Sequence, residues 1–157
     1  METLVINTDA FEMTEDQFFR FCIQNRDLKI ERNYNKQIFI MSPTGFETGK
    51  RNAEIIFQLE NWNRKYKSGY VFDSSTGFTL PNNAVRSPYA AWIKKERADN
   101  LSENEKKQFA HICPDFIIEL KSKSDSLKNL QEKMEEWINN GCGLGWLIDF
   151  EDKKTYI

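Results

Sequence analysis

Histidine and cysteine are scarce in this sequence, which has one histidine and three cysteines among 157 residues. The single histidine, His111, excludes a metal site built from several histidines, and it leaves Ser/His or Cys/His catalysis dependent on one residue. Cys22, Cys113 and Cys142 form no CxxC pair and cannot all be joined in disulfides. We therefore expect the reducing setting of the cytoplasm.

Long hydrophobic runs are also absent. No segment approaches the ~18 apolar residues that a membrane span needs, and the N-terminus lacks the basic-then-apolar layout of a secretory signal, so we expect no membrane partner. The net charge of −2 does not indicate nucleic-acid binding by the whole molecule, and any such surface must be local. With 39% hydrophobic and 13% aromatic residues, the chain predicts one domain over 1–157 with a real core.

The first part of the chain predicts a helix followed by a β-hairpin. Thr14 and Gln17 have the spacing of a capping box, which marks the start of the helix. Residues 28–31 and 37–41 alternate apolar and polar side chains on either side of an Asn-rich segment, which is typical of a hairpin. Glu31 ends the first of these strands, where it is either an exposed charge or part of a site.

The middle of the chain predicts a long helix and several short strands. Apolar residues spaced by three and four predict the helix over 48–66, ended by Gly69. Strands are predicted over 70–73, over 77–80 and, after a proline entry, over 86–93.

The last part predicts a β-strand, an α-helix and a second strand. Residues 115–121 and 144–149 are the apolar strands, and residues 127–138 have the spacing of an amphipathic helix between them. Strands connected through a helix are usually parallel, with a right-handed crossover. The chain therefore predicts an α/β fold with a mixed central sheet flanked by helices.

Glu119 and Lys121 form a candidate site at the end of strand 115–121. Residues two apart on a strand point to the same face, so this carboxylate and this ammonium are expected side by side. Such a pair could hold a divalent cation and position water, or stabilise charge, in phosphodiester hydrolysis. The alternative is an ion pair on an edge strand, because Glu-x-Lys is a common sequence.

Six short motifs follow one another along the chain. They are MSPTG at 41–45, FDSSTGF at 72–78, RSP at 86–88, CPDFIIEL at 113–120, KM at 133–134 and LGWLID at 144–149. Each is weak alone, but in this order, from about Thr14 to Ile157, they resemble the Uma-two family of endonucleases in the PD-(D/E)xK superfamily. The resemblance implies a restriction-endonuclease-like fold, a Mg²⁺ or Mn²⁺ cofactor and DNA as the substrate, and analogy with the superfamily suggests a homodimer.

The resemblance also implies roles for particular residues. Glu119 matches the metal-binding carboxylate of the core strand, and Glu31 matches an acidic residue that supports the metal. Two lysines are candidates for the catalytic lysine. Lys121 fits the Glu-x-Lys spacing and is slightly preferred because it shares a strand face with Glu119, whereas Lys133 stands on the following helix, where many relatives carry a lysine.

Tyr89 departs from the family pattern. Relatives read Arg-Ser-Pro-Asp, and that aspartate is a metal ligand, whereas Tyr89 follows the same three residues here. Tyrosine is neutral near pH 7 and bulky, which makes it a poor ligand for a hard cation. Asp115 is a poor substitute, since it lies roughly 13 Å from Glu119 along the strand, and it is expected to cap the start of that strand. Asp73 is a further candidate on a neighbouring strand.

Together these observations predict a metal-dependent endodeoxyribonuclease whose activity is impaired by Tyr89. The alternative is a catalytically inactive domain of the same fold that binds DNA or protein, and a weaker alternative is a structural subunit of a larger assembly. The residues that would bind DNA are not identified. A smaller departure is Lys123, which replaces a proline usual in the turn after strand 115–121. The chain ends at Ile157, where relatives usually continue, so we expect the C-terminal edge to be incomplete or capped by a partner.

Overall fold

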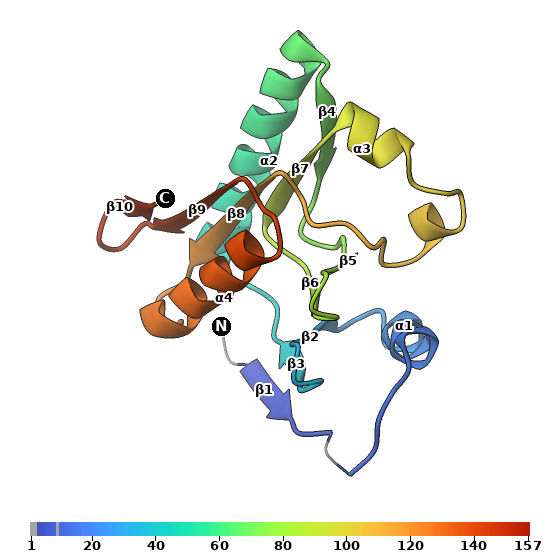
Figure 1. Ribbon diagram of the computed structural model, residues 1–157. Coiled ribbons are helices and arrows are strands. Elements are labelled where there is room, and N and C mark those ends of the chain that lie inside the picture. Colours follow the sequence, from blue (N-terminus) through green and yellow to red (C-terminus); the bar gives the residue numbers. More distant parts are fainter. Residues whose placement is uncertain (1–2, 9) are drawn as a thin grey trace.

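The computed structural model describes residues 3–8 and 10–157 and contains two five-stranded β-sheets with helices around them (Figure 1). The strands of the first sheet are β1 (Thr3–Ile6), β2 (Lys29–Arg32), β3 (Ile38–Met41), β5 (Phe78–Thr79) and β6 (Val85–Arg86). Those of the second are β4 (Gly69–Phe72), β7 (Ala90–Lys94), β8 (Phe116–Lys121), β9 (Leu144–Asp149) and β10 (Lys154–Tyr156). The helices are α1 (Glu15–Gln24), α2 (Phe46–Tyr66), α3 (Lys95–Asp99) and α4 (Leu127–Asn139), with a 3-10 turn η1 (Glu105–Lys107).

The second sheet is the predicted mixed sheet, with strand order β10-β9-β8-β7-β4. Strands β8 and β9 are parallel, in a register that runs from Phe116 opposite Leu144 to Lys121 opposite Asp149, and α4 connects them. The other neighbours in this sheet are antiparallel. The predicted strand–helix–strand unit is therefore confirmed.

The first sheet is antiparallel throughout, in the order β1-β3-β2-β6-β5. Its strands β2 and β3 are the predicted hairpin. The helix α1 before it begins with the predicted capping box, in which the Gln17 backbone N–H donates to Thr14 Oγ1 and the Thr14 backbone N–H donates to Gln17 Oε1. Both local predictions are confirmed, although the division of the strands into two sheets was not foreseen.

The strand predicted over 86–93 is confirmed after its proline entry, as β7, but its first half is wrong. It consists of β6, which pairs with strands of the first sheet, and β7, which pairs with strands of the second. Pro88 between them has no N–H to give to a strand ladder. The Ser87 backbone N–H donates to the Glu31 carboxylate, and the Ser87 hydroxyl donates to the Ser74 carbonyl oxygen. The chain therefore crosses from one sheet to the other at the residues that the family resemblance had singled out.

The prediction that Gly69 ends the second helix is also wrong. The helix α2 ends at Tyr66, and Lys67 caps it with a left-handed backbone, at φ 52°. Gly69 is the first residue of β4, where a Cβ atom would collide with the Ile93 carbonyl oxygen and the Trp92 ring. This glycine is required for a close approach of two strands and not for a turn.

The core fills both faces of the second sheet. On one face, Ile117 and Ile93 pack with Trp137 of α4, and on the other Ile118 and Leu120 pack with apolar side chains of α2. Figure 1 agrees with this layering, since α4 and α2 lie on opposite sides of the sheet. Because side chains alternate along β8, Glu119 faces α4 with Ile117. No helix among residues 3–8 and 10–157 is both long and apolar enough to cross a membrane.

Candidate active site

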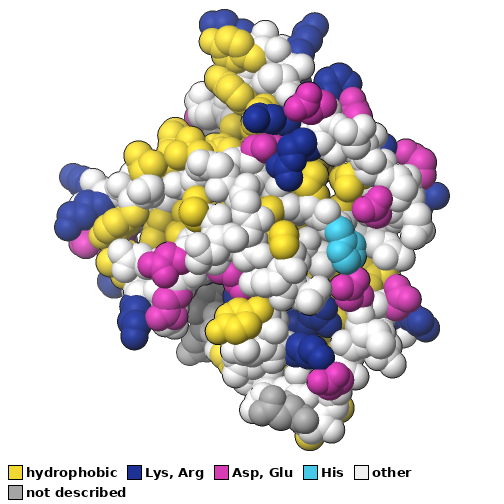
Figure 2. Space-filling model, in the orientation of Figure 1, with side chains coloured by type: hydrophobic (Ala, Val, Ile, Leu, Met, Phe, Trp, Pro, Cys, Tyr) yellow, Lys and Arg dark blue, Asp and Glu magenta, His cyan; other side chains and the backbone are white. Residues whose placement is uncertain are grey.

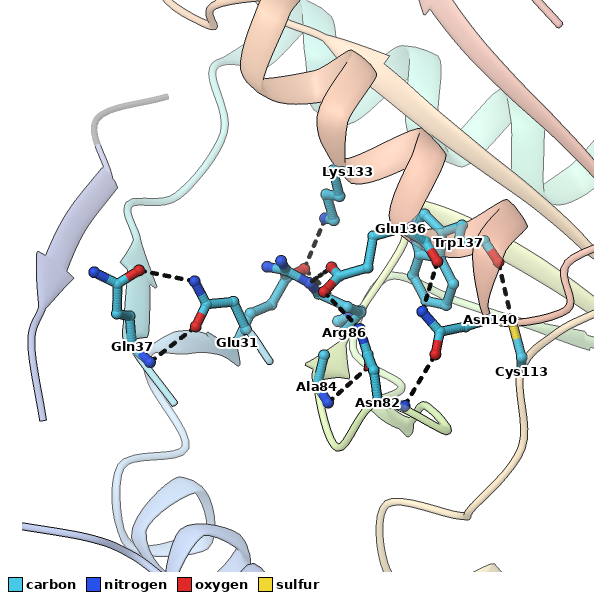
Figure 3. A network of polar contacts seen from close by, with 12 residues as sticks. Glu31, Gln37, Asn82, Ala84, Arg86, Cys113, Lys133, Glu136, Trp137 and Asn140 are labelled. Carbon is cyan, nitrogen blue, oxygen red and sulfur yellow. Dashed lines mark hydrogen bonds and ion pairs between the residues drawn. The ribbon is translucent and has the colours of Figure 1, made fainter. Parts of the chain in front are cut away.

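Two glutamates from different sheets meet at one lysine. Figure 3 shows this lysine, Lys133, with Glu31, Arg86 and Glu136 around it. Lys133 of α4 places its Nζ 2.9 Å from Glu31 Oε1 of β2 and 2.8 Å from Glu119 Oε1 of β8. Glu31 is 2% exposed and Glu119 is 1% exposed. Unpaired charges at such depth are costly, so one ammonium between two carboxylates makes the burial of both tolerable.

A second cation extends this cluster. Arg86 Nη1 lies 3.3 Å from Glu31 Oε2, and Arg86 Nε lies 2.6 Å from Glu136 Oε2 of α4. The Ser87 backbone N–H donates to Glu31 Oε1, and the Trp137 indole N–H donates to Glu119 Oε1. Both oxygens of Glu31 are therefore engaged, and each cation contacts two carboxylates.

The neighbouring charges shift the pKa values of Glu31 and Lys133. Burial alone would raise the pKa of Glu31, but Lys133 and Arg86 outweigh that effect and hold the pKa below its ordinary value. Burial opposes the charge of Lys133 as well, yet Glu119 and Glu31 raise the pKa of this lysine above its ordinary value. At neutral pH Glu31 and Lys133 are consequently an ion pair.

A cavity of about 620 Å³ lies between the first sheet and α4. Its lining includes Lys29, Glu31 and Phe39 from the sheet, Glu119 from β8, and Asn129 and Lys133 from α4. This volume is in the range of small-molecule and cofactor sites. On the face of the molecule in Figure 2, Lys and Arg side chains are interspersed with Asp and Glu.

Tyr89 borders the same cavity at the start of the second sheet. The residue is 6% exposed, and its hydroxyl is buried without a hydrogen-bond partner among the described residues. Burial raises the pKa of this phenol above its usual value, and the nearby Glu119, Asp125 and Glu31 raise it further. The Lys29 ammonium lies 5.0 Å from the centre of the Tyr89 ring. Tyr89 is therefore neutral, next to a cation and the two glutamates.

Lys121 lies apart from this cluster. Its Nζ is 3.1 Å from Asp149 Oδ2, on the residue directly opposite in the parallel register with β9. Lys121 is not among the residues that line the cavity. The structure thus brings Lys133 to the two glutamates, whereas Lys121 shares only a strand face with Glu119.

Asp115 and Asp73, the two aspartates considered as substitutes for the family aspartate, have structural partners outside the cavity. Asp115 accepts a hydrogen bond from the Lys94 backbone N–H and pairs with Arg97 at 2.9 Å, which anchors the start of β8 as expected. Asp73 accepts hydrogen bonds from the backbone N–H and hydroxyl of Ser75, in the turn after β4. Neither aspartate lines the cavity.

The model of a protein family described as "Putative restriction endonuclease", Uma2, matches residues 15–157. The chain belongs to the Uma2 family. A crystal structure of a protein from Anabaena variabilis ATCC 29413, described as "a putative nuclease belonging to DUF820", is similar, with a TM-score of 0.67 and 18% sequence identity over 92% of this chain and 83% of that chain. A search of curated proteins finds no match.

These comparisons confirm the Uma2 resemblance seen in the motifs, and they confirm a mixed α/β fold of the restriction-endonuclease type. The family and the fold together indicate a nuclease. The identity to the Anabaena variabilis protein is low, so that likeness bears on the fold alone.

The residues of this Uma2 site fit a divalent cation poorly. Glu31 and Glu119 are buried carboxylates that line the cavity, and Lys133 already contacts both. Tyr89 stands where the family resemblance implies a metal-binding aspartate, and its neutral side chain supplies no anionic ligand. Among the residues that the structure describes, no group of three or more histidine, cysteine, aspartate or glutamate side chains is arranged to hold a metal ion.

Three residues of the site were missed from the sequence. Arg86 stood inside a recognised motif but was given no role. Glu136 follows Lys133 by three residues, which places both on one face of a helix. Lys29 precedes Glu31 by two residues, which places both on one face of a strand. The spacing was a usable signal in the last two cases.

Proposed function

We propose that this Uma2 protein is a metal-dependent endodeoxyribonuclease whose hydrolytic activity is reduced by Tyr89. The observation that carries the proposal is that Tyr89, Glu31 and Glu119 border one cavity, although they come from three separate segments of the chain. Tyr89 also holds the position at which the family pattern has a metal-binding aspartate. A change of one ligand in an otherwise assembled site would weaken the binding of Mg²⁺ or Mn²⁺.

The remaining residues have the chemistry that phosphodiester hydrolysis needs. Glu31 and Glu119 are the carboxylates that would hold a divalent cation in an intact site. Lys133 would stabilise negative charge on the phosphoryl oxygens or orient the attacking water. Between the two lysines the proposal favours Lys133, because Lys121 would first have to leave Asp149.

Tyr89 weakens the site in two ways. Its phenol is held neutral by burial and by the neighbouring carboxylates, so the site lacks one negative charge. The hydroxyl is sealed from solvent, and the side chain occupies volume at the cavity that a shorter aspartate would leave free. A homodimer that cuts both strands is part of the proposal by analogy, and sedimentation of the wild-type protein tests it.

Plasmid cleavage tests the proposal. The wild-type protein and Tyr89→Asp are compared with Mg²⁺ and with Mn²⁺, and the double variant Tyr89→Asp/Glu119→Ala is the control. We expect cleavage by Tyr89→Asp, little by the wild type and none by the double variant. Equal cleavage by wild type and Tyr89→Asp would contradict an impairment by Tyr89.

A second candidate function is a catalytically inactive domain that binds DNA or protein. The observation that favours it is the mutual neutralisation of the cluster, in which Lys133 and Arg86 each contact two carboxylates. Binding of DNA by both proteins, without cleavage by either, would support this candidate over the nuclease.

A further inference from the structure

Lys29 differs from the other two cations that line the cavity. Lys133 and Arg86 each contact two carboxylates. Among the described residues, the Lys29 ammonium has no ion pair and no hydrogen bond, and it lies over the Tyr89 ring, 5.0 Å from the ring centre. Burial lowers the pKa of Lys29, although the nearby charges of Glu31 and Glu119 act against that effect. The side chain is half-buried and faces the cavity. It is therefore a cation whose N–H groups remain available.

We propose that Lys29 binds a phosphate group of a nucleic-acid strand in this cavity, an inference that rests on the DNA-directed function proposed above. An ammonium has three N–H donors, and phosphate oxygens are strong acceptors. The Tyr89 ring attracts the positive charge but leaves these donors free. Lys133 and Arg86 are less suited to this role, because each would first have to give up a buried carboxylate.

The acidic side chains that line the cavity with Lys29 each have another partner, including Glu132, whose Oε1 lies 3.8 Å from Lys128 Nζ. Glu31 and Glu119 contact Lys133, and Glu136 contacts Arg86. Asp125, which also lines the cavity, accepts hydrogen bonds from the Ser122 backbone N–H and hydroxyl. An anion beside Lys29 therefore meets carboxylates whose charge is largely compensated.

Tyr89 acts in this proposal as a positioning residue. An aspartate at this position would offer Lys29 a carboxylate partner and compete with a phosphate for it. The neutral tyrosine holds the ammonium through its ring face and leaves it unpaired. The same residue that weakens a cation site therefore favours an anion site.

Binding without metal tests the proposal, because EDTA prevents any cleavage. Fluorescence anisotropy with a labelled DNA duplex over a series of salt concentrations compares wild type with Lys29→Met, Lys29→Arg and Tyr89→Phe. Lys107→Met is the matched control, since Lys107 is an exposed lysine of η1 that does not line the cavity. Thermal melting of each variant establishes that it is folded.

We expect Lys29→Met to weaken DNA binding roughly tenfold and to reduce the slope of log K against log salt by about 0.9, the value for one lost phosphate contact. Lys29→Arg, Tyr89→Phe and Lys107→Met should keep an affinity and a salt slope close to those of wild type. The first keeps the cation, the second keeps the aromatic ring, and the third lies outside the cavity. An affinity and slope of Lys29→Met equal to those of Lys107→Met would overturn the proposal.

A titration with inorganic phosphate, followed by the backbone NMR signals of β2, separates this inference from the proposed function. Shifts in wild type and Lys29→Arg, without any DNA binding, would sustain the anion site and reject DNA as the substrate. DNA binding that Lys29→Met leaves intact would reject the role of Lys29 alone. Absence of both phosphate and DNA binding would reject both.

Discussion

The Lys133 ammonium on α4 lies 2.8 Å from the Glu119 carboxylate on β8. The same ammonium contacts Glu31, so its removal leaves two buried carboxylates without their shared cation. We expect Lys133→Met to lower the free energy of unfolding in urea by roughly 3–5 kcal/mol, as for other broken buried ion pairs. Lys128→Met on the same helix is the control, because Lys128 is exposed and its pair with Glu132 is long, at 3.8 Å. Equal losses in the two variants would show that the cluster does not stabilise the fold.

The Tyr89 hydroxyl is buried without a hydrogen-bond partner among the described residues. Because an unsatisfied buried hydroxyl costs free energy, we expect Tyr89→Phe to raise the free energy of unfolding by about 1 kcal/mol. Tyr70→Phe is the matched control, since the Tyr70 hydroxyl donates to Asp99 at 2.8 Å and its removal should lower stability. Urea denaturation measures both, and a loss in Tyr89→Phe would mean that the hydroxyl has a partner.

Glu31 makes stability depend on pH. Its pKa is lower in the folded protein than in the unfolded chain, because the attraction of Lys133 and Arg86 exceeds the effect of burial. The resulting stabilisation is complete above the ordinary carboxyl pKa of about 4.3 and is lost as pH falls from there towards the lower folded pKa. We expect the stability of Glu31→Gln to fall less than that of wild type over this acidic window. Parallel pH profiles from urea denaturation would contradict the lowered pKa.

Gly69 and Gly49 should respond in opposite directions to alanine. A Cβ atom at Gly69 would meet the Ile93 carbonyl oxygen and the Trp92 ring, so we expect Gly69→Ala to lower the free energy of unfolding by more than ~2 kcal/mol. A Cβ atom at Gly49 of α2 would have its nearest neighbour, Thr44 Oγ1, at 3.8 Å, an ordinary contact. Gly49→Ala should therefore raise stability by about 0.5–1 kcal/mol through helix propensity. Similar effects at both sites would mean that β4 and β7 can separate at little cost.

Local patterns in the sequence carried much of the fold. The capping box of Thr14 and Gln17 and the parallel pairing of β8 with β9 follow from short-range chemistry and from connection rules, and both are present. The break of the chain at residues 87–89 could not be predicted in the same way. It depends on the Glu31 carboxylate, which is far away in the sequence and accepts the Ser87 N–H.

The candidate site was predictable only in part. Glu119 was singled out by its strand spacing with Lys121, the family resemblance gave Glu31 its role, and the structure brings both glutamates to one cavity. The choice between the two lysines could not be settled from spacing, because spacing fixes the face of a strand but not the partner that a long side chain reaches. Lys121 lies opposite Asp149, and that register is a property of the folded sheet.

The most direct test of the central claim, that Tyr89 separates this site from a metal site, is calorimetric titration with Mn²⁺. The proteins compared are the wild type, Tyr89→Asp and Tyr89→Asp/Glu119→Gln. We expect no measurable binding by the wild type, binding by Tyr89→Asp and loss of binding in the double variant. Failure of Tyr89→Asp to bind Mn²⁺, or wild-type binding as tight as that of Tyr89→Asp, would contradict the claim.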